Sequence, residues 1–198
     1  MYTIGIDTSH LFLLIVLMDE DRVIDYRQLD CFKQQSEYII VTLDELLKAN
    51  GLTVEQVGSL VVTLGPGSYT GVRIGLTVAK VLGSIAEKQV YTLSTLQLYA
   101  GLADCYVLMD ARAKRVYVGH YKNGQPLEAD QIIYNADMEE TVNDPSANCI
   151  GDLHLFGKPD RYEHLAENFM ALKPYWQKVE DIDRLAPKYL KSRKEYLK

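Results

Sequence analysis

The chain has 198 residues, of which 47% are hydrophobic and 24% charged, as in an ordinary globular protein that can bury a core without disulfides or metals. Its net charge of −6 at pH 7 argues against a protein whose main task is to bind nucleic acid. Cys31, Cys105 and Cys149 form no CxxC pair and lie beside apolar residues, so we expect buried thiols in a reducing compartment. The sequence shows neither a signal peptide nor an apolar window of 18 residues, which predicts a cytoplasmic protein without a membrane span.

The first half of the chain alternates short apolar runs with helical patterns. Periodicity and turn residues predict, in chain order, strands at 2–7, 11–18 and 22–29, a helix at 36–51, a strand at 59–64, a helix at about 70–87, a strand at 89–94 and a short helix at 95–102. The order βββαβαβ begins with an antiparallel meander and continues with strands separated by helices. It therefore predicts a mixed sheet with helices packed on it.

The second half of the chain loosely repeats this pattern. Strand-like segments are CYVLMDA, RVYVGHY, QIIY and ANCIGD, and helix candidates are ADMEETVN and DRYEHLAENF. We divide the chain into a first lobe, residues 1–102, and a second, reduced lobe, residues 103–198, which ends in a basic tail. The last eleven residues carry five basic side chains and one Glu. They predict either a solvated tail or a contact for an acidic partner or RNA.

The segment GPGSYTGVRIG, residues 65–75, raises the question of a phosphate-binding loop. It lacks the Lys of a GxxxxGK[ST] loop, and its glycine spacing is one residue too long for GxGxxG. A helix N-terminus attracts anions without any motif, so some phosphate affinity remains open. The alternative is that Gly65 and Gly67 let the strand turn sharply into the helix, with Ser68 or Thr70 as the N-cap.

The helix after this loop has an unusually small polar face. Its large apolar residues are Ile74, Val78, Val81, Leu82 and Ile85, and a row of small residues at i+4 spacing is Gly71, Gly75, Ala79 and Gly83. Only a narrow polar strip remains, which predicts two packing partners, one of them the sheet of its own lobe. We expect the small row to meet the second partner. That partner is either the helix at 36–50 or another protein chain.

A longer pattern resembles the TsaB (YeaZ) family of bacterial proteins. VTLGPGSYTGVRIGLTVAKVLG is preceded by YTIGIDTS and followed by LSTLQ, MDARAKRVYVG and LAPKYLK, so the resemblance covers nearly the whole chain in order. GPGSYTGVRIG is the specific part, whereas IDTS and STL are weak alone. The resemblance implies an α/β, two-lobed actin/Hsp70/sugar-kinase-like (RNase H-like) fold with mixed sheets.

The same resemblance implies a function without catalysis by this chain. It implies a partner subunit that binds and activates a TsaD-like threonylcarbamoyltransferase, which forms N6-threonylcarbamoyladenosine at position 37 of tRNAs. Further implied partners are a TsaE-like ATPase, tRNA through the complex, and a second copy of the chain when TsaD is absent. Together with the helix faces, it predicts partner-binding residues Ser68, Thr70, Gly71, Arg73, Ile74, Gly75, Thr77, Val78 and Ala79.

The residue chemistry favours this interpretation. TsaD-like subunits carry a metal-binding HxxxH helix, where this chain reads QQSEYII, and its four histidines are too widely spaced for a recognisable metal set. In Asp7-Thr8-Ser9-His10, Thr stands at the glycine place of the phosphate loop of active members of the fold. We expect no catalytic residue, no metal and no cofactor in this chain alone. A nucleotide could be held at the assembled interface.

The competing function is a stand-alone ATP-dependent kinase or carbamoyltransferase of the same fold. Asp7 and Asp110 would then be metal-binding carboxylates. Their structural alternatives are that Asp7 caps the turn that follows it and that Asp110 orients Arg112. A metallopeptidase is disfavoured because the sequence contains neither HExxH nor HxxxH.

Overall fold

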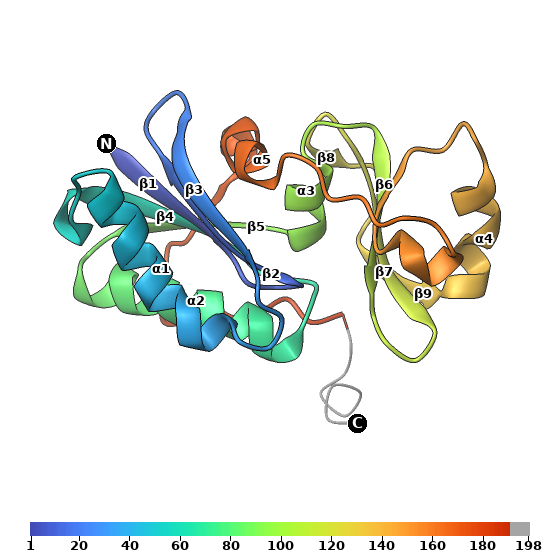
Figure 1. Ribbon diagram of the computed structural model, residues 1–198, viewed down its shortest axis with the longest axis horizontal. Helices are drawn as coiled ribbons and strands as arrows, with labels where there is room; N and C mark the ends of the chain where they lie inside the picture. Colours follow the sequence, from blue (N-terminus) through green and yellow to red (C-terminus); the bar gives the residue numbers. More distant parts are fainter. Residues whose placement is uncertain (191–198) are drawn as a thin grey trace. The chain divides into compact units, whose positions relative to one another are not determined.

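The computed structural model describes residues 1–190 and divides into two compact units, each with its own sheet (Figure 1). The first unit comprises Met1–Ser94 and Trp176–Lys188, and the second is built around Thr95–Tyr175. The boundary lies before residue 102 because helix α3 (Thr95–Ala100) packs on the strands of the second unit. The predicted two-part division also lacked the return of Trp176–Lys188 to the first unit.

The first unit has the predicted βββαβαβ order. Its elements are β1 (Tyr2–Asp7), β2 (Phe12–Met18), β3 (Val23–Asp30), α1 (Gln35–Ala49), β4 (Val57–Thr63), α2 (Tyr69–Ile85), β5 (Gln89–Leu93) and, from the end of the chain, β11 (Gln177–Lys178). The strand order is β11-β5-β4-β1-β2-β3, with β4 parallel to both β1 and β5 and the other pairs antiparallel. Across residues 1–190, no helix combines the length and apolarity needed to cross a bilayer.

Helices α1 and α2 lie side by side over the sheet of the first unit (Figure 1). Ile39, Leu43 and Leu46 of α1 belong to the same buried cluster as Val72 and Leu76 of α2. That cluster also contains alternate residues of the central strands, including Ile4, Ile6, Leu13, Ile15, Leu60 and Val62. The two helices therefore share one core with the sheet, as the alternation of apolar residues requires.

Residues Trp176–Lys188, here called the return segment, run along the open edge of this sheet. β11 pairs antiparallel with β5, and the Val179 amide donates to the Val90 carbonyl at 2.9 Å. Val179, Ile182 and Leu185 pack against the core of the first unit. At the end of the segment, the Lys188 amide donates to the Leu64 carbonyl at 2.8 Å. Lys188 thus lies beside Leu64 and Gly65, where the GPGSYTG loop begins.

The second unit contains a smaller mixed sheet. Its elements are α3, β6 (Cys105–Asp110), β7 (Arg115–Lys122), β8 (Gln125–Pro126), β9 (Gln131–Tyr134), α4 (Asn135–Asn143), β10 (Cys149–Gly151) and α5 (Leu165–Ala171). The order is β10-β6-β7-β8, and β9 also pairs with β7. The helix predicted over DRYEHLAENF begins only at Leu165. Arg161 forms an isolated bridge with Gly151, and His164 has a left-handed φ of 52°.

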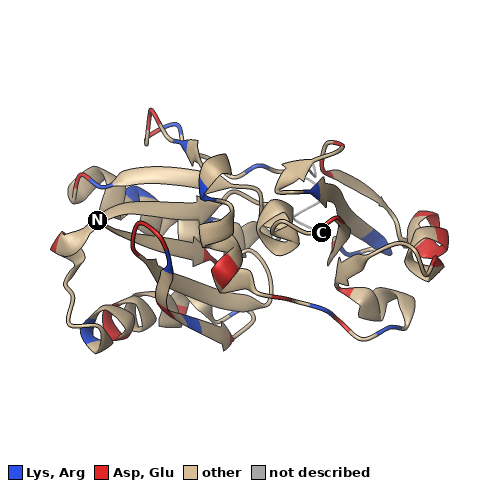
Figure 2. Ribbon diagram, turned by 90° about the horizontal axis from the view of Figure 1, so that it is seen from above, with Lys and Arg blue, Asp and Glu red and all other residues tan. Residues whose placement is uncertain are grey.

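A long stretch of the second unit contains acidic residues but no basic ones. Residues 123–157 contain no Lys or Arg, and the exposed side chains of α4 include Asp137, Glu139 and Glu140. Figure 2 colours the acidic residues of the chain red and the basic residues blue. The exposed charged side chains of α4 itself are therefore acidic.

Candidate docking site between two helices

Helices α1 and α2 border a groove of about 880 Å³ with mainly apolar walls. Its apolar lining comes from both helices: Ile39, Ile40, Leu43 and Leu47 of α1, and Ile74, Val78, Val81 and Leu82 of α2. Polar side chains line it as well, among them Ser36, Asp44, Lys48, Arg73 and Thr77. An apolar groove with a few polar groups at its margin is suited to receive an amphipathic helix of a partner.

Several large apolar side chains of these helices face solvent. Ile40 is 59% exposed and Val81 is 48% exposed, and both line the groove. At the N-terminal end of α2, Arg73 donates to the Tyr69 hydroxyl at 2.9 Å, and its guanidinium carbon lies 5.3 Å from the ring centroid. This pair gives the groove one ordered polar end.

The predicted partner-binding residues divide into two groups. Thr70, Arg73, Ile74, Thr77 and Val78 line the groove, and their role in binding a partner stays a prediction. The other four do not line it: Ser68 is the N-cap of α2 and accepts from the Gly71 amide at 3.2 Å, and Gly71, Gly75 and Ala79 are buried.

The expectation that the small row meets a second helix is wrong. A Cβ atom at Gly71 would lie 2.2 Å from the Thr8 carbonyl oxygen, and one at Gly75 would lie 2.9 Å from the Thr8 hydroxyl oxygen. A Cβ atom at Gly83 would lie 2.8 Å from Val90 Cγ2 and 3.1 Å from Ile182 Cδ1. The glycines therefore allow α2 to approach its own unit closely. The i+4 spacing of the sequence identified the face of small residues but not the surface that this face contacts.

The Thr8 side chain enters the hydrogen-bond ladder of α2. Its hydroxyl donates to the Gly71 carbonyl at 2.7 Å and accepts from the Gly75 amide at 3.0 Å. An ordinary α-helix joins these two backbone groups directly. Sequence reasoning missed this contact, and the available signal was a pair of glycines at i, i+4 in a helix next to a strand that ends in IDTS.

Two amides of the glycine loop are engaged within the first unit. The Ser68 amide donates to the Ser9 carbonyl at 2.8 Å, and the Gly71 amide is used by the Ser68 side chain. Gly67 packs so closely that a Cβ atom would lie 2.4 Å from the Ser9 carbonyl oxygen. Gly65 has a φ of 100°, which makes the sharp turn that the sequence predicted. Both amides and both glycines thus serve the fold of the first unit.

The two candidate carboxylates of the enzyme alternative are occupied by protein donors. The Ser9 amide, the Ser9 hydroxyl and the Thr63 hydroxyl all donate to one oxygen of the buried Asp7, at 3.1, 2.5 and 2.5 Å. Asp110 accepts from the Arg112 amide at 2.7 Å and pairs with its guanidinium at 2.9 Å. These contacts match the structural alternatives for both residues.

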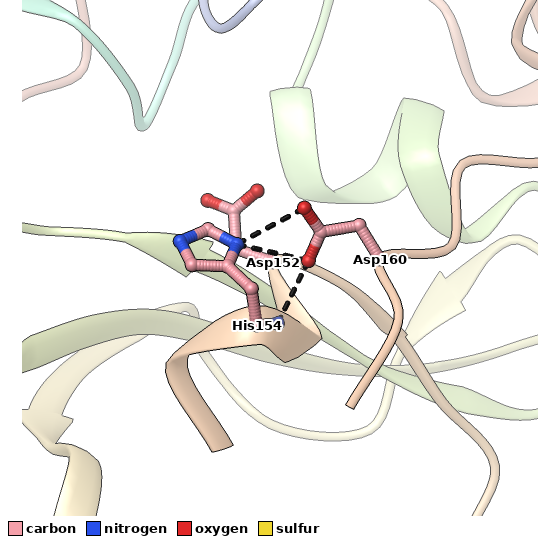
Figure 3. A group of neighbouring side chains, drawn as sticks. All are labelled: Asp152, His154 and Asp160. Atoms are coloured by element: carbon pink, nitrogen blue, oxygen red, sulfur yellow. Dashed lines mark hydrogen bonds and ion pairs between the residues drawn. The ribbon is translucent and has the colours of Figure 1, made fainter. Parts of the chain in front are cut away.

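A group that sequence reasoning did not bring together is Asp152, His154 and Asp160, whose ligand atoms lie within 4.8 Å of one another (Figure 3). His154 Nδ1 lies 2.9 and 3.0 Å from the two Asp160 oxygens, and the His154 amide donates to Asp160 at 2.8 Å. The buried Asp152 accepts from the Asp110 amide at 2.6 Å and from the Tyr162 hydroxyl. Hydrogen bonds within the unit account for the group, and we assign it no ligand.

The thiols are buried and free, as predicted. Burial raises the pKa of Cys105 to about 12, and it also raises the pKa of Cys31 and of Cys149. Because a nucleophilic cysteine needs a lowered pKa, none of the three fits that role.

The sequence is similar to a characterised family. The family model described as "TsaD: tRNA N6-adenosine threonylcarbamoyltransferase" matches residues 30–145. The Bacillus subtilis protein named "tRNA threonylcarbamoyladenosine biosynthesis protein TsaB" is 33% identical over 153 residues, which cover 73% of this chain and 67% of the relative. The Escherichia coli protein of the same name is 25% identical over 93% of this chain and 76% of its own length.

Two solved structures from Pseudomonas aeruginosa share the fold. One is described as an uncharacterized protein with similarity to peptidase YEAZ, with a TM-score of 0.78 and 20% identity. The other is YeaZ, with a TM-score of 0.74 and 21% identity. Each comparison covers 96% of this chain and 99% of the other. With the two units and mixed sheets described above, they confirm the predicted two-lobed actin/Hsp70/sugar-kinase-like (RNase H-like) α/β fold.

Proposed function

Because the chain belongs to the TsaB (YeaZ) family, we propose that it acts in threonylcarbamoyladenosine biosynthesis as a non-catalytic partner subunit. It binds a TsaD-like threonylcarbamoyltransferase and activates it for N6-threonylcarbamoyladenosine formation at position 37 of tRNAs. The assembled complex, rather than this chain, is the enzyme. The stand-alone kinase or carbamoyltransferase is not favoured, because Asp7 and the glycine loop are engaged within the first unit.

The observation that supports this proposal is the apolar groove between α1 and α2. Ile40 and Val81 place large apolar surface in it that no residue of the described chain covers fully. Burying apolar surface is the main favourable term in most protein association. We propose that the TsaD-like subunit lays a helix face into this groove, and that Arg73 and Thr77 make polar contacts at its edge.

The test is a pair of matched substitutions on α2. Val81→Asp places a charge in the groove, and Ile85→Asp places the same charge on an apolar residue that is 80% exposed and does not line the groove. Desolvating an unpaired carboxylate costs several kcal/mol, so Val81→Asp should weaken binding of the TsaD-like subunit by about 100-fold or more. Ile85→Asp should change it by about twofold or less.

Binding is measured by calorimetry with the purified TsaD-like subunit, and function by tRNA modification in the reconstituted system. We expect no modification by this chain alone and strong stimulation when it is added to the other components. Equal binding by the two variants, or robust modification by this chain alone, would contradict the proposal. A melting curve for each variant confirms that the fold is intact.

The remaining parts of the assembly are proposals that rest on the family. A TsaE-like ATPase joins the complex, tRNA is contacted through the complex, and the chain forms a homodimer through the same groove when the TsaD-like subunit is absent. We propose that this cytoplasmic chain holds no cofactor alone and that a nucleotide can bind at the assembled interface. Isothermal titration of the chain alone and of the complex with Mg-ATP separates these two situations.

A further inference from the structure

The loop between β1 and β2, residues 8–11, contacts the first turns of both groove helices. Through Thr8 it enters α2, as described above, and the Ser9 carbonyl accepts from the amide of Ser68, the N-cap of α2. On the other side, the buried Gln35 at the first position of α1 donates through its side-chain amide to the His10 carbonyl at 3.0 Å. One loop of four residues is therefore bonded to both walls of the groove.

The bonds to α2 are made on the face opposite to the groove. Gly71 and Gly75 face Thr8, whereas Arg73, Ile74 and Thr77 line the groove. Because a helix moves as a stiff rod over a few turns, the depth at which Gly71 and Gly75 rest on Thr8 also sets the height of Arg73 and Ile74 in the groove.

The Thr8 hydroxyl is the specific element in this arrangement. It bonds to both the Gly71 carbonyl and the Gly75 amide, the two backbone groups that the regular helix pattern pairs with each other. A group inserted into the ladder bends or shifts a helix at that turn. Without the hydroxyl, both backbone groups lose their bond to the β1–β2 loop, and the first turns of α2 are no longer held to the loop at this point.

We propose that Thr8 is a positioning residue for the docking groove, because its bonds set the placement of α2 against α1. Gln35 has the same role on α1. This inference rests on the proposed function, because it concerns the surface that receives the TsaD-like subunit. It adds a role for a buried loop that does not line the groove.

The experiment compares Thr8→Val, which keeps the shape and removes the hydroxyl, with Thr8→Ser, which keeps the hydroxyl. Thr3→Val is the matched control. It removes another buried hydroxyl of the same β1–β2 hairpin, whose partner is the Ser59 hydroxyl at 2.7 Å. Affinity for the TsaD-like subunit is measured by calorimetry, the melting temperature by scanning calorimetry, and the exchange rate of the Gly75 amide by hydrogen–deuterium exchange.

Thr8→Val should weaken binding by about tenfold, roughly the effect of one lost buried hydrogen bond on a preorganised surface, with Thr8→Ser within about threefold of wild type. Thr3→Val should lower the melting temperature by a comparable amount and leave the affinity unchanged. The altered ladder should also change the Gly75 exchange rate in Thr8→Val beyond any change in Thr3→Val.

Gln35→Met provides a second route that does not depend on the folding of Thr8→Val. It removes the bond to the His10 carbonyl and should weaken binding about three- to tenfold. Wild-type affinity in both Thr8→Val and Gln35→Met, or an equal loss in Thr3→Val, overturns the inference. A wild-type chain that does not bind the TsaD-like subunit, or a Val81→Asp variant that binds normally, instead overturns the proposed function, and the two failures are thus distinguishable.

Discussion

The amide nitrogen of Gly75 lies 3.0 Å from the hydroxyl oxygen of Thr8, and a Cβ atom at position 75 would lie 2.9 Å from that oxygen. Such a separation leaves no room for a methyl group without movement of the helix or the loop. The glycine is therefore needed for a contact inside the first unit.

We predict that Gly71→Ala and Gly75→Ala both destabilise the chain although Ala is the better helix former. The effect should be larger for Gly71, whose new methyl group would meet the backbone oxygen of Thr8 at 2.2 Å. Overpacking of about 1–3 kcal/mol exceeds the propensity gain of about 1 kcal/mol at position 71. Urea unfolding measures the change, with the exposed helical position Ser84→Ala as the control. A Gly71→Ala variant as stable as Ser84→Ala would contradict the close contact between Gly71 and the Thr8 carbonyl oxygen.

Asp7→Asn should reduce stability and leave activation of the TsaD-like subunit intact. The amide oxygen can still accept from Ser9 and Thr63, but it carries no charge, and hydrogen bonds to charged groups contribute about 1.5–3 kcal/mol, more than neutral ones. A carboxylate that holds a catalytic metal would instead cost on the order of 100-fold or more in rate. The measurement is tRNA modification by the reconstituted complex, normalised to the folded fraction. A 100-fold loss in folded protein would restore the enzyme alternative.

The free energy of unfolding should fall with pH above the ordinary thiol range because of Cys105. Burial raises the pKa of this thiol from 9.0 to about 12 in the folded chain. Between these values the unfolded chain releases the proton and the folded chain keeps it, so stability falls by about 1.4 kcal/mol per pH unit for this group. Urea titrations from pH 8.5 to 10.5 measure the slope. Cys105→Ala should have a slope shallower by that amount, and identical slopes would place the thiol in contact with water.

Ile182→Asp should unfold or strongly destabilise the first unit. Ile182 packs against the core and lies beside Gly83, and an unpaired carboxylate there loses both packing and hydration. Arg184→Asp is the matched control, because Arg184 is in the same segment with a side chain that is 88% exposed. Thermal melting followed by circular dichroism measures both variants. Similar melting temperatures would mean that the return segment is not part of the core.

The basic tail predicted from the sequence lies, in residues 191–198, outside the described part of the chain. These residues include four basic side chains and one Glu. If the tail binds tRNA in the assembled complex, its removal should flatten the dependence of log affinity on log salt by about one unit for each phosphate that the tail neutralises. Binding is measured between about 50 and 200 mM salt. An unchanged slope assigns the tail to solvated surface.

Local patterns predicted most elements of the first unit because each has a strong period and clear ends. The helix predicted at 36–51 ends at Ala49, two residues before Gly51, which has a φ of 66°, and Ser68 caps α2 as expected. The pattern of α2 also predicted that little of it would be polar. It could not show which partner each face meets, because that depends on the Thr8 loop, more than sixty positions earlier in the chain.

Long-range contacts account for most of what the sequence did not reveal. The return segment has only a two-residue strand, Gln177–Lys178, and its apolar residues Val179, Ile182 and Leu185 follow no strand period. Its place beside β5 follows from pairing with an edge strand some ninety residues away. The contribution of α1 to the groove had a visible signal, since Ile40 and Val41 extend the apolar run beyond the buried Ile39.

The return segment also fixes an order of events during synthesis. The second unit is built around the contiguous stretch Thr95–Tyr175, so its sheet can form once that stretch has left the ribosome. The sheet of the first unit gains its last strand and part of its core only from Trp176–Lys188, which is translated after the whole of the second unit. A nascent chain that stops before Trp176 leaves the edge of β5 unpaired, an exposed template for pairing with other chains. The unit that begins first is thus the last to be completed.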